Sequence, residues 1–207
     1  MARTKDPDRT RELLDACCDY VERTGLGDLT LRPMAEGVGV SPRTLLYHFG
    51  SREELIIAVI RRSRERGLAD VAALLTGTGG DEARDSGSGS IGELVEGLAA
   101  ALWQTSLADT ARPFLLLFYE AYVMSLRKPD TFRQLLDQLS AEAQQAIRDA
   151  LERAGVDATN ADFTASEIVA IHRGLQLEWL ATGRTEELTE AHRRAIARVA
   201  HAISSSE

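Results

Sequence analysis

The stretch from Gly37 to Arg52, GVGVSPRTLLYHFGSR, decides how the N-terminal part of this chain folds. Its first glycines favour a turn, Ser41 is a good N-cap, and Pro42 suits the first position of a helix. The preceding segment, LRPMAE after Thr30, predicts another short helix. Two short helices joined by a glycine turn are typical of a helix-turn-helix.

The segments on either side of this motif are also helical. Asp6 followed by Pro7 predicts the start of a first helix, with Leu13, Cys17 and Val21 among its inner residues and an end at Gly25. After Gly50, Ser51 and Glu54 have the spacing of a capping box, which predicts a long helix from Arg52 toward Leu75. A three-helix DNA-binding domain over residues 1–50 is the expected result.

On a helical wheel the second short helix has two faces. Positions 45, 46 and 49 fall together, so Leu45, Leu46 and Phe49 are expected to pack against the other helices. The other side chains include a guanidinium, a hydroxyl, a phenol and an imidazole, which suit base edges and phosphates. The outward residues are therefore Arg43, Thr44, Tyr47 and His48.

Charge restricts where nucleic acid could bind. The chain has a net charge of -8, but residues 1–66 carry 12 Lys+Arg against 11 Asp+Glu, or +1, which leaves -9 for the remainder. Phosphate binding requires basic surface. Only the N-terminal third is therefore compatible with DNA.

Composition excludes several other classes. Uninterrupted apolar runs reach only six residues, as at Phe114 to Tyr119, against roughly 18 for a membrane span. The only cysteines, Cys17 and Cys18, are neighbours and cannot form a disulfide framework. The four histidines have no metal-ligand spacing, and two of them, His192 and His201, are expected to be exposed. We expect a cytoplasmic protein that is not an enzyme, has no cofactor, holds no metal and does not bind a membrane.

The rest of the chain is expected to be helical as well. Apolar spacing and caps predict further helices at about 91–107, 112–127, 130–154, 161–182 and 186–204. The segment 76–90, TGTGGDEARDSGSGS, is rich in glycine and serine and predicts a mobile loop. The fold class is all-α, with a larger C-terminal domain over residues 51–207.

The N-terminal sequence resembles the DNA-binding signature of the tetracycline-repressor (TetR) family. The similarity covers about 50 residues and is densest from Thr30 to Leu55, TLRPMAEGVGVSPRTLLYHFGSREEL. It implies a DNA-reading recognition helix, and it departs from the usual pattern at Arg43, where most members have a small residue, and at Leu46, where most have tyrosine. A guanidinium at position 43 makes guanine recognition possible.

The resemblance implies roles for eight residues. Some would read bases from the start of the recognition helix, some would hold the DNA backbone, and one from each flanking helix would reach a base or a phosphate. They are Arg32, Ser41, Pro42, Arg43, Thr44, Tyr47, His48 and Arg52.

Aromatic residues are concentrated in the larger domain. Phe114, Phe118, Tyr119 and Tyr122 fall within nine residues of one expected helix, and they could form either core or the wall of a ligand cavity. Members of the family commonly hold such a cavity, so the resemblance favours a small, largely apolar effector. The residues expected to bind it are Trp103, Phe118, Tyr119, Tyr122, His172, Gln176 and Trp179.

The last two expected helices suggest an oligomer. Apolar positions are numerous for helices that end a monomer, although they could also pack within one subunit; they include Ile168, Leu175, Trp179, Leu188 and Val199. The resemblance implies a homodimer through these helices, and a twofold dimer suits a palindromic double-stranded DNA operator. The resulting expectation is a ligand-released repressor, and the alternative is a helical adaptor that binds only proteins.

Overall fold

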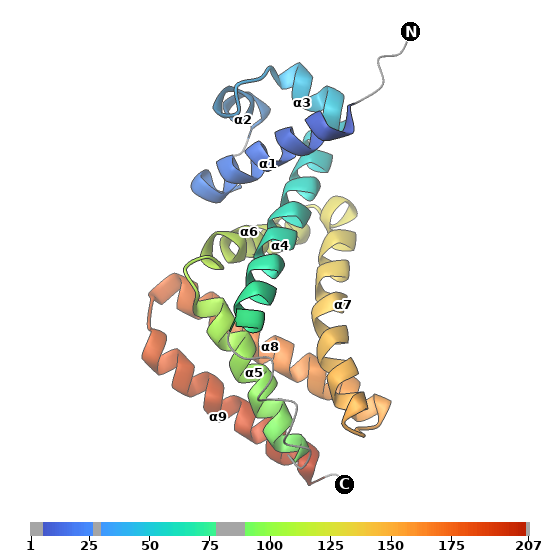
Figure 1. The fold of residues 1–207 in the computed structure, drawn as a ribbon, viewed down its shortest axis with the longest axis vertical. Helices are drawn as coiled ribbons and strands as arrows, with labels where there is room; N and C mark the ends of the chain where they lie inside the picture. The colour runs from blue at the N-terminus through green and yellow to red at the C-terminus, as the bar shows by residue number, and fades with distance from the viewer. Residues whose placement is uncertain (1–5, 27–29, 78–89, 206–207) are drawn as a thin grey trace. The chain divides into compact units, whose positions relative to one another are not determined.

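The computed structural model describes residues 6–26, 30–77 and 90–205, and the side chains of residues 67–77 are not considered. Within these ranges the chain forms nine helices and no strand, which confirms the all-α expectation (Figure 1). Their bounds are α1 Pro7–Thr24, α2 Leu31–Gly37, α3 Pro42–Phe49, α4 Arg52–Gly77, α5 Ile91–Leu107, α6 Arg112–Arg127, α7 Pro129–Arg153, α8 Ala158–Thr182 and α9 Thr185–Ser204.

Most helix ends lie where local sequence chemistry places them. Asp6 accepts hydrogen bonds from the first turn of α1, and Gly25 ends that helix with a φ of 77°. The expected capping box forms at the start of α4 through Ser51 and Glu54, and a second one forms at the start of α5 through Ser90 and Glu93. Thr30 differs, because α2 begins after it but its side chain makes no capping hydrogen bond. Most of the segment expected as a mobile loop, residues 78–89, lies outside the described residues.

The chain divides into two compact units, Met1–Ala73 with Pro113–Leu136, and Leu74–Arg112 with Asp137–Glu207. The expected domain boundary at residue 50 stays a prediction. In the first unit α4 is joined to α1 by ion pairs, with Arg62 Nε 2.8 Å from an Asp15 oxygen and Arg66 Nη1 2.7 Å from Asp19. These contacts continue well past residue 50, so the first unit includes most of α4.

The core of the first unit encloses both cysteines. Cys17 and Cys18 are fully buried, and the Cys18 thiol donates to the backbone oxygen of Val59 at 3.7 Å. Burial raises the pKa of Cys17 to about 12 and that of Cys18 to about 11. Both side chains are therefore small apolar core groups, protonated at neutral pH.

The second unit is built around α9, which packs against both α5 and α8. Figure 1 shows α5 and α9 side by side along most of their length. Residues of α5, α7, α8 and α9 form one continuous apolar cluster, which includes Val95, Leu151, Ile168, Ile196 and Ile203. Several apolar positions that suggested a dimer surface from the sequence are thus buried within one chain, among them Ile168, Trp179, Leu188 and Val199.

Candidate nucleic-acid interface and helical-domain cluster

Two glycines make the α2–α3 turn possible. A Cβ at Gly37 would lie 2.3 Å from the Tyr20 ring, so no larger residue fits there without displacing that ring. Gly39 has a φ of 73°, which glycine adopts without strain. Val40 N–H then donates to Ala35 O at 2.9 Å and closes the turn. The sequence therefore fixes the angle between the two short helices locally.

The N-terminus of α3 is capped by its own residues. Ser41 Oγ accepts from Thr44 N at 3.1 Å and lies 2.8 Å from Thr44 Oγ1, while Pro42 occupies the first turn. Ser41 and Thr44 thus shape the helix start in addition to any contact with DNA. Pro42 and Arg43 are exposed beside them.

The outer face of α3 is wider than the wheel predicted. Leu45 is fully buried and Phe49 is half-buried, as expected, but Leu46 is 38% exposed and does not pack in the core. The prediction for Leu46 is wrong because an eight-residue helix buries a narrow face, and Leu46 is turned by about 100° from Leu45. Tyr47 is 41% exposed and extends the outer surface.

His48 holds α3 against α1. Its Nδ1 lies 2.7 Å from Thr10 Oγ1, and the imidazole is half-buried. The same surface has a hollow of ≈ 480 Å³ shared by the start of α1 and the outer face of α3. Its lining residues are Asp6, Arg9, Ser41, Arg43, Thr44, Tyr47 and His48. Five of the eight expected DNA-binding residues therefore lie together, and the contributions of Asp6 and Arg9 were missed because they come from another helix.

The two flanking arginines lie outside this hollow. Arg32 on α2 is strongly exposed and pairs with Glu36 at 3.3 Å. Arg52 at the start of α4 lies 3.7 Å from Glu53 and is about one-third exposed. Arg32 is accessible to a phosphate, and exposed pairs of this kind exchange readily because they contribute little to stability.

The residues expected to bind an effector form two groups, one in each unit. In the first unit, the Phe118 ring centroid is 5.5 Å from that of Tyr119 and 5.1 Å from that of Tyr122. Trp103, His172, Gln176 and Trp179 belong to the second unit. That both groups line one cavity stays a prediction.

In the second unit, three of these residues join a buried polar cluster. Gln176 Nε2 donates to Ser106 Oγ at 2.8 Å, and His172 Nε2 lies 3.0 Å from the same oxygen. Trp103 Nε1 donates to Thr189 Oγ1 at 2.8 Å. Ser106 and Thr189 were not predicted, because a lone hydroxyl on an amphipathic helix has no distinctive sequence signal.

His192 is the main correction in this unit. It was expected on the surface, yet it is 3% exposed and stacks on Trp103 with ring centroids 4.7 Å apart. The reason is that α9 packs between α5 and α8, so its inner face is wider than that of a terminal surface helix. His201, by contrast, is exposed as expected.

Burial keeps both imidazoles neutral. It lowers the pKa of His172 to about 4, with a further contribution from the neighbouring His192 and Arg173, and it also lowers the pKa of His192. Among the described residues, neither His172 Nδ1 nor His192 Nε2 has a hydrogen-bond partner. The cluster therefore contains unused hydrogen-bonding capacity.

A search of the described helices for a membrane-spanning segment finds none with sufficient length and apolarity.

A helix-turn-helix held by α1, with its second helix presenting arginine, hydroxyl and phenol groups outward, defines a DNA-binding protein. Family models match both parts of the chain: residues 13–59 match "Bacterial regulatory proteins, tetR family", and residues 89–202 match "Tetracyclin repressor-like, C-terminal domain". The chain belongs to the TetR family of transcriptional regulators, and it is a DNA-binding regulator and not an enzyme.

Individual relatives agree with this assignment. The regulator BetI of Brucella anthropi is 38% identical over 56 residues, which are 27% of this chain and 29% of BetI. This chain thus aligns with less than a third of that relative's length.

Solved structures cover much more of the chain. A TetR-family regulator from Rhodococcus sp. has a TM-score of 0.67 at 21% identity, over 93% of this chain and 99% of that one. The multidrug binding protein EbrR, solved with imidazole, has a TM-score of 0.62 at 26% identity, over 92% and 90% of the two chains. The fold is therefore shared over nearly the whole chain.

Proposed function

We propose that this chain is a homodimeric repressor that a small, largely apolar effector releases from a palindromic operator. The observation that carries the DNA-binding part is the outer face of α3, where Arg43, Thr44 and Tyr47 surround one hollow beside a capped helix start. A guanidinium at position 43 can donate two hydrogen bonds to guanine in the major groove. Arg32 and Arg52 flank this face and would hold phosphates.

Dimerisation through the last two helices is supported by α8. Its outward side has an apolar and small-residue stripe, with Phe163 66% exposed and Leu177 49% exposed. Ala170, Gly174 and Ala181 are also exposed. The five positions follow one another at spacings of seven, four, three and four residues, which places all five on one helix face. Small residues allow a second helix to approach closely, so we place the interface on this α8 stripe and not on the buried apolar positions of the last two helices.

The effector part of the proposal rests on polar groups that lie among aromatic rings within each unit, Tyr122 in the first and His172 in the second. The related multidrug binding protein EbrR was solved in complex with imidazole. In the proposed mechanism, the effector favours a separation of the two α3 helices that cannot span half-sites about 34 Å apart.

The DNA-binding part is tested by selecting bound sequences from random oligonucleotides and titrating salt. We expect a palindromic motif whose affinity falls as salt rises. Arg43→Ala should change the preferred base at one position of each half-site, because it removes a base contact. Arg52→Ala should weaken all sites alike, because it removes a phosphate contact. Binding without sequence preference would instead favour a protein-binding adaptor.

The dimer part is tested by sedimentation of two matched variants. Leu177→Arg places a charge on the α8 stripe and should give monomers. Leu126→Arg is the control, because Leu126 is 82% exposed on α6 and is not one of the stripe residues. A dimer that survives Leu177→Arg would exclude the α8 stripe as the interface.

The effector part is tested by a thermal-shift screen of lipophilic compounds. A compound that stabilises the protein should also release DNA, and its affinity should change in Tyr122→Phe or in His172→Ala. Unchanged affinity in both variants would place the effector elsewhere.

A further inference from the structure

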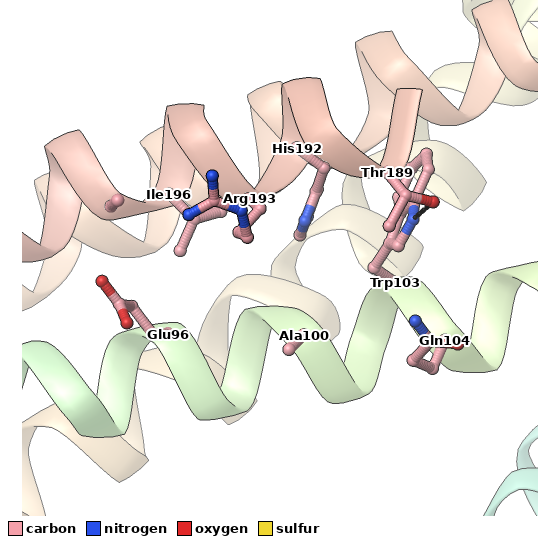
Figure 2. A pocket seen from close by; sticks show the side chains of 9 residues that line it. Glu96, Ala100, Trp103, Gln104, Thr189, His192, Arg193 and Ile196 are labelled. Atoms are coloured by element: carbon pink, nitrogen blue, oxygen red, sulfur yellow. Dashed lines mark hydrogen bonds between the residues drawn. The ribbon is translucent and has the colours of Figure 1, made fainter. Parts of the chain in front are cut away.

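A groove between α5 and α9 lies on one side of the second unit (Figure 2). Its volume is ≈ 320 Å³, within the range of small-molecule sites. Both walls consist of helices from the same unit, so the groove exists within one chain. The lining residues are Glu96, Ala100, Trp103, Gln104, Thr189, His192, Arg193, Ile196 and Ala197.

Small residues open the groove. Ala100 on α5 is exposed, and Ala197 on α9 is half-buried. Larger side chains at either position would fill the space between the helices, as Ile196 does beside them with 2% exposure. The small side chains therefore leave space between the two helices, and most of the surface that faces this space is apolar.

The floor of the groove is aromatic and rigid. Trp103 is 1% exposed, its Nε1 donates to Thr189 Oγ1 at 2.8 Å, and its ring stacks on His192 at an interplanar angle of 18°. Figure 2 shows the His192 side chain extending from α9 toward α5, directly above Ala100. An aromatic ligand ring would meet ring edges and faces here, which is a favourable contact.

His192 also supplies an unsatisfied polar atom. Its Nε2 is buried and has no hydrogen-bond partner among the described residues. A buried polar group without a partner is costly, and a ligand that supplies the partner recovers that cost. A hydroxyl suits either tautomer of the neutral imidazole, because it can both donate and accept.

Charge at the rim favours a neutral ligand. The groove has one carboxylate, Glu96, and one guanidinium, Arg193, so its formal charges cancel. Arg193 is also occupied by Glu190, with 2.7 Å between Nη2 and a carboxylate oxygen. A charged ligand on the apolar floor would lose hydration without a dedicated counter-charge.

We propose that the α5–α9 groove binds a small neutral aromatic alcohol, whose ring lies between Ala100 and Ala197 and whose hydroxyl bonds to His192 Nε2. Only Trp103 is shared with the residues expected from the sequence to bind an effector. The proposal concerns binding within the second unit, and it does not depend on whether the chain binds an operator.

The test uses 4-fluorophenol as the probe and 4-fluorotoluene as its matched analogue without a hydroxyl. Binding to the full chain is followed by fluorine NMR, and the imidazole nitrogens of the four histidines are followed by nitrogen NMR. We expect millimolar affinity for the phenol, about tenfold weaker binding of the toluene, and a shift confined to His192 and its neighbour His172. Equal binding of both probes, or no shift at His192, would overturn the proposal.

Two adjacent alanines on α5 provide the matched variants. Ala100→Leu fills the groove and should reduce phenol binding at least tenfold, whereas Ala101→Leu adds the same side chain at an exposed position that does not line the groove. Equal phenol affinity in both variants would place the site elsewhere. Loss of the dimer in Ala100→Leu alone would show that a second copy of the chain covers the groove, and would also overturn the proposal.

DNA binding is measured separately on the same samples. If phenol binds as expected and no operator is found, the groove proposal stands and the proposed function fails. If an operator is found and phenol does not bind, the groove proposal fails alone.

Discussion

Removing the Glu120 carboxylate should destabilise the connection between α1 and α6. Glu120 accepts a hydrogen bond from the backbone N–H of Leu26, which directly follows the end of α1, and Leu26 is 1% exposed. Water cannot readily replace the carboxylate at so buried a residue. The N–H would then be left without a partner.

The magnitude follows from the charged acceptor. Hydrogen bonds to charged groups contribute about 1.5–3 kcal/mol, so Glu120→Ala should lower the free energy of unfolding by about 2 kcal/mol. For a chain of this size each kcal/mol corresponds to about 2–4 °C, which gives a fall in Tm of about 4–8 °C. Glu120→Gln keeps an uncharged oxygen acceptor and should cost about half as much.

Thermal unfolding of both variants, followed by circular dichroism, measures this difference. Glu152→Ala is the control, because Glu152 is an exposed glutamate near the end of α7. The reasoning is refuted if Glu120→Ala unfolds at the same temperature as this control, or if Glu120→Gln is as unstable as Glu120→Ala.

Three further predictions concern pH and helix capping. The Arg62 hydrogen bond and charge lower the pKa of Asp15, so Asp15→Asn should be less stable than the wild type at neutral pH. This difference in the free energy of unfolding, measured by urea titration, should disappear as pH falls below about 4; a difference that stays constant with pH would contradict this. Burial lowers the pKa of His172 to about 4, so between pH 6.5 and 4 the unfolded chain binds a proton that the folded chain does not, and stability falls as pH falls through that range. In His172→Gln the urea midpoint should therefore change less with pH over the same range. Ser51 Oγ accepts from Glu54 N at 3.1 Å, so Ser51→Ala should cost about 1 kcal/mol in chemical denaturation, and an unchanged midpoint would mean that the cap contributes nothing.

Helix positions could be predicted because their signals are local. Asp6, Ser41, Ser51 and Ser90 each cap the helix that follows them through atoms only two or three residues away. The expected bounds of α5 and α6 agree with the structure, and those of α7, α8 and α9 agree within a few residues. No knowledge of packing was needed for these features.

The errors arise where burial depends on a distant partner. His192 is buried because α5 packs against the face of α9 on which it lies, and the residues next to His192 in the sequence do not show that packing. The partner of Leu26 N–H, Glu120, is 94 residues away. The same limit applies to the candidate site, where the polar outward residues of α3 were predicted but Asp6, which caps α1, and Arg9 on α1 were not.

Because neither native cysteine is accessible, the change in spacing that the proposed mechanism requires can be measured with a single introduced label. Because Cys17 and Cys18 are fully buried and protonated at neutral pH, maleimide reagents should leave them unmodified in the folded protein. A single cysteine introduced at an exposed position of α1, such as Arg11, would then carry the only dye on each subunit. Energy transfer between the two dyes of the proposed dimer would report the spacing of its two α1 helices, and with it that of the helix-turn-helix motifs, with and without effector in an otherwise wild-type chain.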